Sequence, residues 1–255
     1  MPINWPSQLW LVRHGQSAGN VARDDADAAR APRIALSVRD VDVPLSELGE
    51  RQSHAVGRWF AGLPADQKPQ AALTSPYLRA RSTARIIQQA GATDPPDAPT
   101  IVDERIREKE FGVLDGLTKF GIAAEHPAQV EFRRLLGKFY HRPPGGESWT
   151  DVILRLRSTV DTLSLHYAGT RVLIVTHQVV VLCFRYLLEN MDEDQILAID
   201  REGDVANCSL TEYTFEGPSG RDALEPRLLR YNFTVPLEDA GAPVTSAPDK
   251  KAAVR

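Results

Sequence analysis

The fold of this chain is constrained most by short, largely apolar segments that are bounded by polar residues. Runs of this length are typical of strands buried on both faces of a sheet. Four segments have this character: residues 9–12 (LWLV), 70–75 (QAALTS), 100–103 (TIVD) and 171–177 (RVLIVTH). Amphipathic helical patterns lie between and after them, over residues 46–63, 77–91, 146–167 and 179–191. Because strands alternate with helices, we expect an α/β fold with three layers, α/β/α, and a mostly parallel central sheet.

The later part of the chain completes this domain and then changes in composition. Residues 207–215 and 227–233 alternate well enough to be a pair of late strands. We therefore expect a single α/β domain over residues 1–234. Residues 235–255 are rich in Pro, Ala and charge, which predicts a poorly ordered C-terminal tail. Residues 21–45 form a long loop after the first strand, and such loops often act as lids or binding loops.

Charge and composition exclude several classes of partner. The formal net charge of −4 does not favour nucleic acid or an acidic membrane surface, so any anion must be bound by a local cationic site. No apolar run approaches the roughly 18 residues of a spanning helix, and residues 1–10 lack the pattern of a signal peptide. Two cysteines are too few for a disulfide framework. We expect a cytoplasmic protein that contacts neither nucleic acid nor membrane.

Polar side chains follow the predicted strands at the point where each strand ends. Arg13 and His14 end the first strand, and His177 ends the strand at 171–177. Arg79 lies in the first turn of the helix after the second strand, and Glu108 follows the strand at 100–103. Ligands of open α/β sheets bind beyond the carboxyl ends of the strands. We therefore expect these five side chains to converge on one site.

Such a set of side chains can bind a phosphate ester and transfer its phosphoryl group. Guanidinium groups match phosphate oxygens with paired donors and stay charged, so Arg13 and Arg79 would neutralise the migrating group. A neutral imidazole such as His14 is a competent nucleophile near pH 7. His177 could donate to the equatorial oxygens. A carboxylic acid such as Glu108 could protonate the departing alkoxide.

Four sequence motifs, in order along the chain, carry a resemblance to a known family. The segments LVRHGQSAGN, TSPYLRARSTA, REKEFGVLDGLT and IVTHQVVV resemble those of the histidine phosphatase superfamily, which includes cofactor-dependent phosphoglycerate mutases and fructose-2,6-bisphosphatases. The motifs span residues 9 to about 188, which is most of the chain. A lone Arg-His-Gly tripeptide would be weak evidence for the family, whereas four motifs in the family's order are specific evidence. The resemblance implies a phosphoglycerate mutase-like fold.

The resemblance also implies roles for individual residues. His14 would become phosphorylated, while Arg13, Arg79 and His177 hold the phosphoryl group and Asn20 touches it. Glu108 falls on the family's acid position, and the motif places it ahead of its neighbours Glu104 and Glu110. Gln16 stands where the family commonly has Glu. The family requires no metal and no further cofactor for hydrolysis.

Comparison with the branches of the family favours a phosphatase over a mutase. The segment after Asn20 lacks the Thr-Gly-Trp of phosphoglycerate mutases, and the region 111–145 is short. Arg155 and Gln178 fall on positions that contact sugar phosphate in the bisphosphatase branch, although that branch has a further arginine where this chain has Leu182. Among the arginines of the long loop, Arg23 is our candidate for substrate binding.

We therefore predict a metal-independent phosphomonoesterase that acts on a small phosphorylated metabolite, such as a sugar phosphate or a phosphoglycerate-like ester. Two alternatives remain at this point: a cofactor-dependent phosphoglycerate mutase, and a non-catalytic relative that binds phosphate or protein. A phosphate or sulfate ion is the expected occupant of the site. A homodimer is compatible with the sequence.

Overall fold

The computed structural model describes residues 5–216 and 225–246, and its centre is a six-stranded sheet. The strand order is β3-β2-β4-β1-β5-β6. The strands are β1 Gln8–Arg13, β2 Ala71–Thr74, β3 Thr100–Val102, β4 Arg171–Thr176, β5 Leu210–Glu216 and β6 Glu225–Phe233. Strands β1 to β4 are mutually parallel, whereas β5 is antiparallel to β1 and to β6. The expectation of a mostly parallel sheet with a pair of late strands is confirmed.

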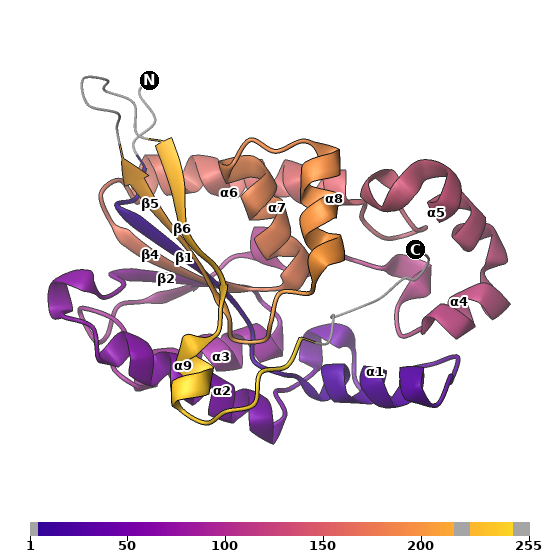
Figure 1. Cartoon of the computed structure of the whole chain (residues 1–255), viewed down its shortest axis with the longest axis horizontal. Helices are drawn as coiled ribbons and strands as arrows, with labels where there is room; N and C mark the ends of the chain where they lie inside the picture. Colours follow the sequence, from indigo (N-terminus) through magenta and orange to yellow (C-terminus); the bar gives the residue numbers. More distant parts are fainter. Residues whose placement is uncertain (1–4, 217–224, 247–255) are drawn as a thin grey trace.

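Helices cover both faces of the sheet, as Figure 1 shows. The α-helices are α1 Ala18–Ala28, α2 Glu47–Ala61, α3 Leu78–Gln89, α4 Lys119–Glu125, α5 Pro127–Tyr140, α6 Trp149–His166, α7 Gln178–Leu188, α8 Glu193–Glu202 and α9 Val235–Asp239. Helices α6, α7 and α8 lie on one face, and α2, α3 and α9 lie on the other (Figure 1). The expected three-layer α/β/α architecture is therefore present.

Alternation along β1 explains why the two faces have separate cores. Successive side chains of a strand point to opposite faces of the sheet. Leu9 and Leu11 pack in the core with α6 and α7, whereas Trp10 and Val12 pack in the core with α2 and α3. A strand buried on both faces needs no polar positions, which is why LWLV is apolar throughout.

Capping residues set where the helices begin. Ser46 accepts a hydrogen bond from the Gly49 amide at the start of α2. Ser148 forms a capping box with Asp151 at the start of α6. These caps satisfy backbone amides that have no partner inside the helix.

The long loop expected over residues 21–45 is shorter in the structure, because α1 occupies its first part. Ser17 and Asn20 form a capping box that starts α1, and the following segment is rich in alanine, which favours helix. The remaining connection, residues 29–45, crosses the site and contains the short 3₁₀ turn η1 Asp40–Asp42.

The expected poorly ordered tail is packed over residues 235–246. Helix α9 inserts Leu237, which has no exposed surface, into the core that also contains Trp10 and Val12. The carbonyl of Pro243 accepts a hydrogen bond from Gln52 Nε2, and the carbonyl of Thr245 accepts one from the amide of Asn207. Composition alone missed this because a few buried residues, among them Pro236, Leu237 and Ala242, anchor a segment rich in Pro, Ala and charge. Residues 247–255 of the expected tail lie outside the described residues.

The packing of α9 predicts a stability effect. The Leu237→Ala variant should lower the free energy of unfolding by about 2–4 kcal/mol, because it removes a fully buried side chain and leaves a cavity. Urea unfolding followed by circular dichroism measures this. The matched control is Val244→Ala on the same segment, whose side chain is largely exposed and should change stability by less than about 0.5 kcal/mol. If both variants lowered the free energy of unfolding by a similar amount, the conclusion that Leu237 anchors this segment in the core would be wrong.

Candidate active site

The strand ends bring the predicted side chains together at one edge of the sheet. His14 follows β1 directly, and His177 follows the neighbouring strand β4 directly. Their ring centroids lie 5.1 Å apart. Arg79 comes from the first turn of α3, after β2, and its guanidinium reaches His14. Glu108 follows the 3₁₀ turn η3 Glu104–Ile106 and faces His177.

A close approach of two backbones fixes the loop that carries His14. A Cβ atom at Gly15 would lie 2.4 Å from the carbonyl oxygen of Gly49, in the first turn of α2. Only glycine fits there, because a real side chain does not approach a backbone oxygen so closely. The Gly15 amide donates to Thr83 Oγ1 at 3.0 Å, which ties the same loop to α3. The turn after β1 is therefore fixed from two sides.

Hydrogen bonds to both ring nitrogens define the protonation pattern of His14. Nδ1 lies 2.7 Å from the carbonyl oxygen of Gly15, and a carbonyl only accepts, so Nδ1 carries the hydrogen. Nε2 lies 3.2 Å from Nε of Arg79, and a guanidinium only donates, so Nε2 presents its lone pair. The neutral imidazole thus directs its nucleophilic nitrogen toward the arginine that the sequence assigns to phosphate binding.

His177 is fully buried between a hydroxyl and a carboxylate. Its Nε2 lies 2.7 Å from Ser75 Oγ, and its Nδ1 lies 3.8 Å from Glu108 Oε2. Glu108 is also fully buried, and its Oε1 accepts a hydrogen bond of 2.7 Å from the Lys109 amide. The two competitors for the acid role lie elsewhere: Glu104 is exposed, and Glu110 accepts from the hydroxyl of Tyr77.

Arg13 and Asn20 are held by backbone and amide groups around the nucleophile. Arg13 has no exposed surface, and its Nη1 donates to the carbonyl of Val205 at 2.5 Å. Asn20 Oδ1 accepts from the Ser17 amide at 2.9 Å. Asn207, which the sequence analysis did not single out, donates from Nδ2 to the His14 carbonyl at 3.1 Å and lies 3.5 Å from Asn20 Oδ1. Only its position just before a late strand would have suggested it.

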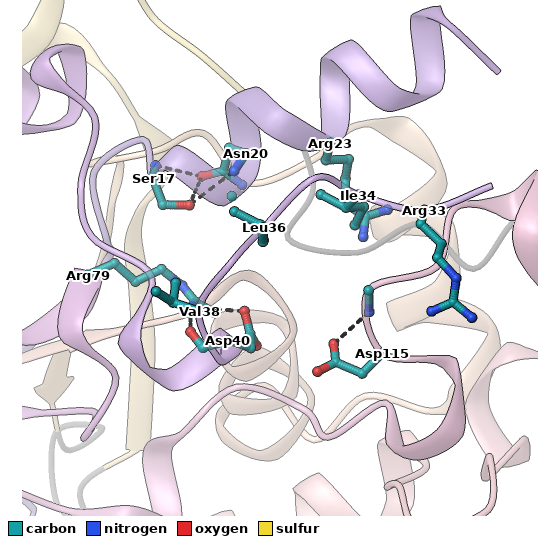
Figure 2. A pocket seen from close by; sticks show the side chains of 12 residues that line it. Ser17, Asn20, Arg23, Arg33, Ile34, Leu36, Val38, Asp40, Arg79 and Asp115 are labelled. Carbon is teal, nitrogen blue, oxygen red and sulfur yellow. Dashed lines mark hydrogen bonds and ion pairs between the residues drawn. The ribbon is translucent and has the colours of Figure 1, made fainter. Parts of the chain in front are cut away.

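A pocket of about 280 Å³ lies beside this cluster. Ser17, Gly19, Asn20, Arg23, Arg33, Ile34, Leu36, Val38, Asp40, Arg79, Asp115 and Gly116 line it. Figure 2 shows Arg79 and Asp40 in contact on one side of the pocket, with Arg23 and Arg33 on the other. Arg23 is almost fully buried and lines the pocket, and its role in substrate binding stays a prediction.

Arg155, the expected contact for sugar phosphate, makes several hydrogen bonds within the chain, and its contact with substrate stays a prediction. Its Nε and Nη2 donate to the two carboxylate oxygens of Glu147, at 2.9 and 3.2 Å. Its guanidinium also donates to the carbonyls of Arg105, Arg107 and Glu108. Because these acceptors lie on the segment that leads into Glu108, the hydrogen bonds from Arg155 order that segment. It does not line the pocket.

Gln178 lies next to the site without lining this pocket. As the first residue of α7 it follows His177, and its Nε2 donates to Asp204 Oδ1 at 2.8 Å. His141 is buried at a distance along the chain from these residues, and its Nε2 lies 3.1 Å from Gln129 Oε1.

Tyr77 packs against the cluster and is a further residue that the sequence analysis missed. Its ring lies 4.8 Å from the guanidinium carbon of Arg79 and 5.1 Å from the ring of His177. Burial raises the pKa of the Tyr77 hydroxyl, and the charges of Glu110 and Asp40 raise it further. The hydroxyl therefore stays protonated and donates to Glu110 at 2.9 Å.

Within 5–216 and 225–246, no group of three or more His, Cys, Asp or Glu side chains is placed to hold a metal ion. In the same part of the chain, no helix has the length and apolar character needed to cross a membrane.

Comparison with known proteins identifies the family. The sequence model described as "Histidine phosphatase superfamily (branch 1)" matches residues 9–223. This chain therefore belongs to the histidine phosphatase superfamily, and its fold is that of the phosphoglycerate mutase-like members. Both expectations from the motifs are confirmed.

Individual relatives cover most of the chain. It is 32% identical over 198 residues to "2,3-bisphosphoglycerate-dependent phosphoglycerate mutase 2" of Gloeobacter violaceus, with 76% of this chain and 81% of that protein covered. It is 31% identical over 218 residues to "Bifunctional protein Rv2228c" of Mycobacterium tuberculosis, with 84% of this chain covered. The match spans only 52% of that relative's length. Among solved structures, "Mycobacterial hydrolase 1" superposes with a TM-score of 0.68 and 25% identity, covering 89% of this chain and 99% of that one.

The carboxylate that holds Arg155 gives a pH-dependent prediction. Burial opposes ionisation of Glu147, but hydrogen bonds from Arg155 and the charges of Arg155 and Arg107 outweigh it, so its pKa lies below the ordinary value of 4.5. A carboxyl whose pKa falls on folding stabilises the native state above the unfolded-state pKa, and loses that contribution as the pH falls through the folded-state pKa.

The Glu147→Gln variant should therefore be less stable than the parent at pH 7 by about 1–3 kcal/mol. The difference should shrink as the pH is lowered below the ordinary value of 4.5. Denaturant unfolding at several pH values measures it, with the exposed Glu104→Gln as control. A destabilisation that does not change with pH would count against the ion pair as its cause.

Proposed function

We propose that this chain is a phosphomonoesterase that hydrolyses a small phosphorylated metabolite through a phosphohistidine at His14. The observation that supports this most is the state of His14: a neutral imidazole whose Nε2 lone pair meets the guanidinium of Arg79. A nucleophile that faces a phosphate-binding cation is the arrangement that phosphoryl transfer requires.

In the first step, His14 Nε2 attacks phosphorus, the N–P bond forms and the ester P–O bond breaks. Arg13, Arg79 and His177 neutralise the charge on the three equatorial oxygens. Glu108 enters this step protonated and gives its proton to the departing alkoxide. Glu108 is fully buried, and its Oε2 lies 3.8 Å from His177 Nδ1, at the edge of the sheet where the ester would lie.

In the second step, the roles reverse. The Glu108 carboxylate takes a proton from a water molecule as the water oxygen attacks phosphorus. The N–P bond breaks, inorganic phosphate is formed, and His14 regains its lone pair at Nε2. The hydrogen bond from Nδ1 to the Gly15 carbonyl holds the ring in the same tautomer through both steps. No step requires a metal ion, so activity should persist in a chelator.

A second candidate is a phosphoglycerate mutase, because one relative of 32% identity carries that name. A mutase returns the phosphoryl group to its substrate, whereas a phosphatase gives it to water. Incubation with 3-phosphoglycerate and catalytic 2,3-bisphosphoglycerate separates the two. Release of inorganic phosphate without 2-phosphoglycerate supports the phosphatase, and formation of 2-phosphoglycerate supports the mutase.

Removal of the nucleophile tests the intermediate. The His14→Gln variant should lose activity toward p-nitrophenyl phosphate by on the order of 10³-fold or more, because no other group can carry the phosphoryl group. Rapid quench of the parent with substrate should yield phosphohistidine that maps to His14 by mass spectrometry. The exposed His54→Gln is the control. A parent that binds phosphate esters without hydrolysing them would instead be the non-catalytic relative.

The acid role of Glu108 predicts a dependence on the leaving group. In the Glu108→Gln variant, the rate of hydrolysis of glycerol phosphate should fall about 10²–10³-fold, because the departing alkoxide needs a proton. With p-nitrophenyl phosphate, whose leaving group needs none, stopped flow should show a burst of about one equivalent of nitrophenol before slow turnover. Glu104→Gln should behave as the parent. Equal losses with both substrates and no burst would contradict this role.

A further inference from the structure

A carboxylate from the loop over the site holds the phosphate-binding arginine. Arg79 Nη1 donates to the backbone carbonyl of Asp40 at 2.7 Å and to Asp40 Oδ1 at 3.2 Å (Figure 2). The Arg79 side chain is 2% exposed, and that of Asp40 is 21% exposed. An ion pair so poorly solvated is stronger than one at the surface.

The same guanidinium contacts the atom that is to be phosphorylated. Its Nε donates to His14 Nε2, the nitrogen that must release this hydrogen bond when phosphorus arrives. The guanidinium therefore has to redirect donors from His14 and Asp40 to phosphate oxygens. Each N–H group of Arg79 that stays hydrogen-bonded to Asp40 is unavailable to the phosphate oxygens.

The position of Asp40 in the fold allows its carboxylate to contact Arg79 and to move away from it. It begins η1, on the connection between α1 and α2. Isolated bridges hold this connection at either side of Asp40, Arg33 to Leu117 before it and Ser17 to Leu45 after it. Asp40 itself lies on the pocket wall beside Val38. A short rotation of this side chain would take the carboxylate away from Arg79 without moving the strands, while the backbone carbonyl of Asp40 keeps its hydrogen bond.

We propose that Asp40 is an internal competitor for Arg79, which lowers the affinity of the site for phosphate and helps to expel it after hydrolysis. The inference rests on the proposed function in assuming that phosphate binds Arg79. The competing explanation is that Asp40 positions Arg79 for catalysis. The two differ in sign: a competitor weakens phosphate binding, and a positioning residue strengthens it.

The Asp40→Asn variant separates them, because the amide removes the charge and keeps the size and an acceptor oxygen. Titration calorimetry with inorganic phosphate measures binding without turnover. We expect Kd to fall about three- to tenfold, with a parallel fall in KM for p-nitrophenyl phosphate. Asp40→Ala, which also retains the backbone carbonyl, should change Kd in the same direction. Asp42→Asn is the matched control, since Asp42 lies in the same turn and pairs with the exposed Arg39.

An unchanged or higher Kd in both Asp40 variants would overturn the inference, and a higher Kd together with a lower kcat would assign a positioning role instead. Because calorimetry needs no catalysis, the outcomes remain separate from the proposed function. A parent that hydrolyses no ester, with tighter phosphate binding in Asp40→Asn, would refute the phosphatase and keep the competitor. If the parent hydrolyses phosphate esters but its Asp40 variants bind phosphate no more tightly, the phosphatase is supported and the competitor role of Asp40 is refuted.

Discussion

The hydrogen bond from His14 Nδ1 to the Gly15 carbonyl is the interaction on which the site depends. It leaves Nε2 as the nitrogen with the lone pair and directs that nitrogen at Arg79. The segment that carries His14 passes close against the first turn of α2, and this approach is possible because Gly15 has no Cβ to collide with Gly49. The setting of the His14 ring thus depends on a close contact between two stretches of backbone.

Burial of charge is the second constraint, because the pocket and its surroundings contain several guanidinium and carboxylate groups with little or no exposed surface. Such groups are stable in a protein interior only where charge and hydrogen bonds compensate their desolvation. The pair of Arg155 and Glu147 shows how this serves the chemistry. Its remaining donors bind the carbonyls that precede and include Glu108, so the ion pair orders the segment that delivers the carboxylic acid.

Much of this could be predicted from the sequence, because local patterns determine it. Apolar runs identified the strands, and the side chains at their ends marked His14, Arg79 and His177, since parallel strands end at a common edge. The remainder depends on contacts between distant segments. Nothing in the local sequence shows that Arg155 faces backbone carbonyls rather than the pocket, or that Asp40 lies against Arg79. The same limit explains the tail, where burial of Leu237 outweighs a composition rich in Pro, Ala and charge.

The segment after α9 has a consequence for where this domain can be cut or joined to another protein. Thr245 accepts from the amide of Asn207 through its carbonyl and donates its hydroxyl to the Asn207 side chain, and that side chain donates to the carbonyl of His14. The backbone behind the nucleophile is therefore linked, through a single amide side chain, to residues close to the C-terminus. A shortened version that stops at the last strand would lose this support, so an expression boundary belongs beyond residue 246.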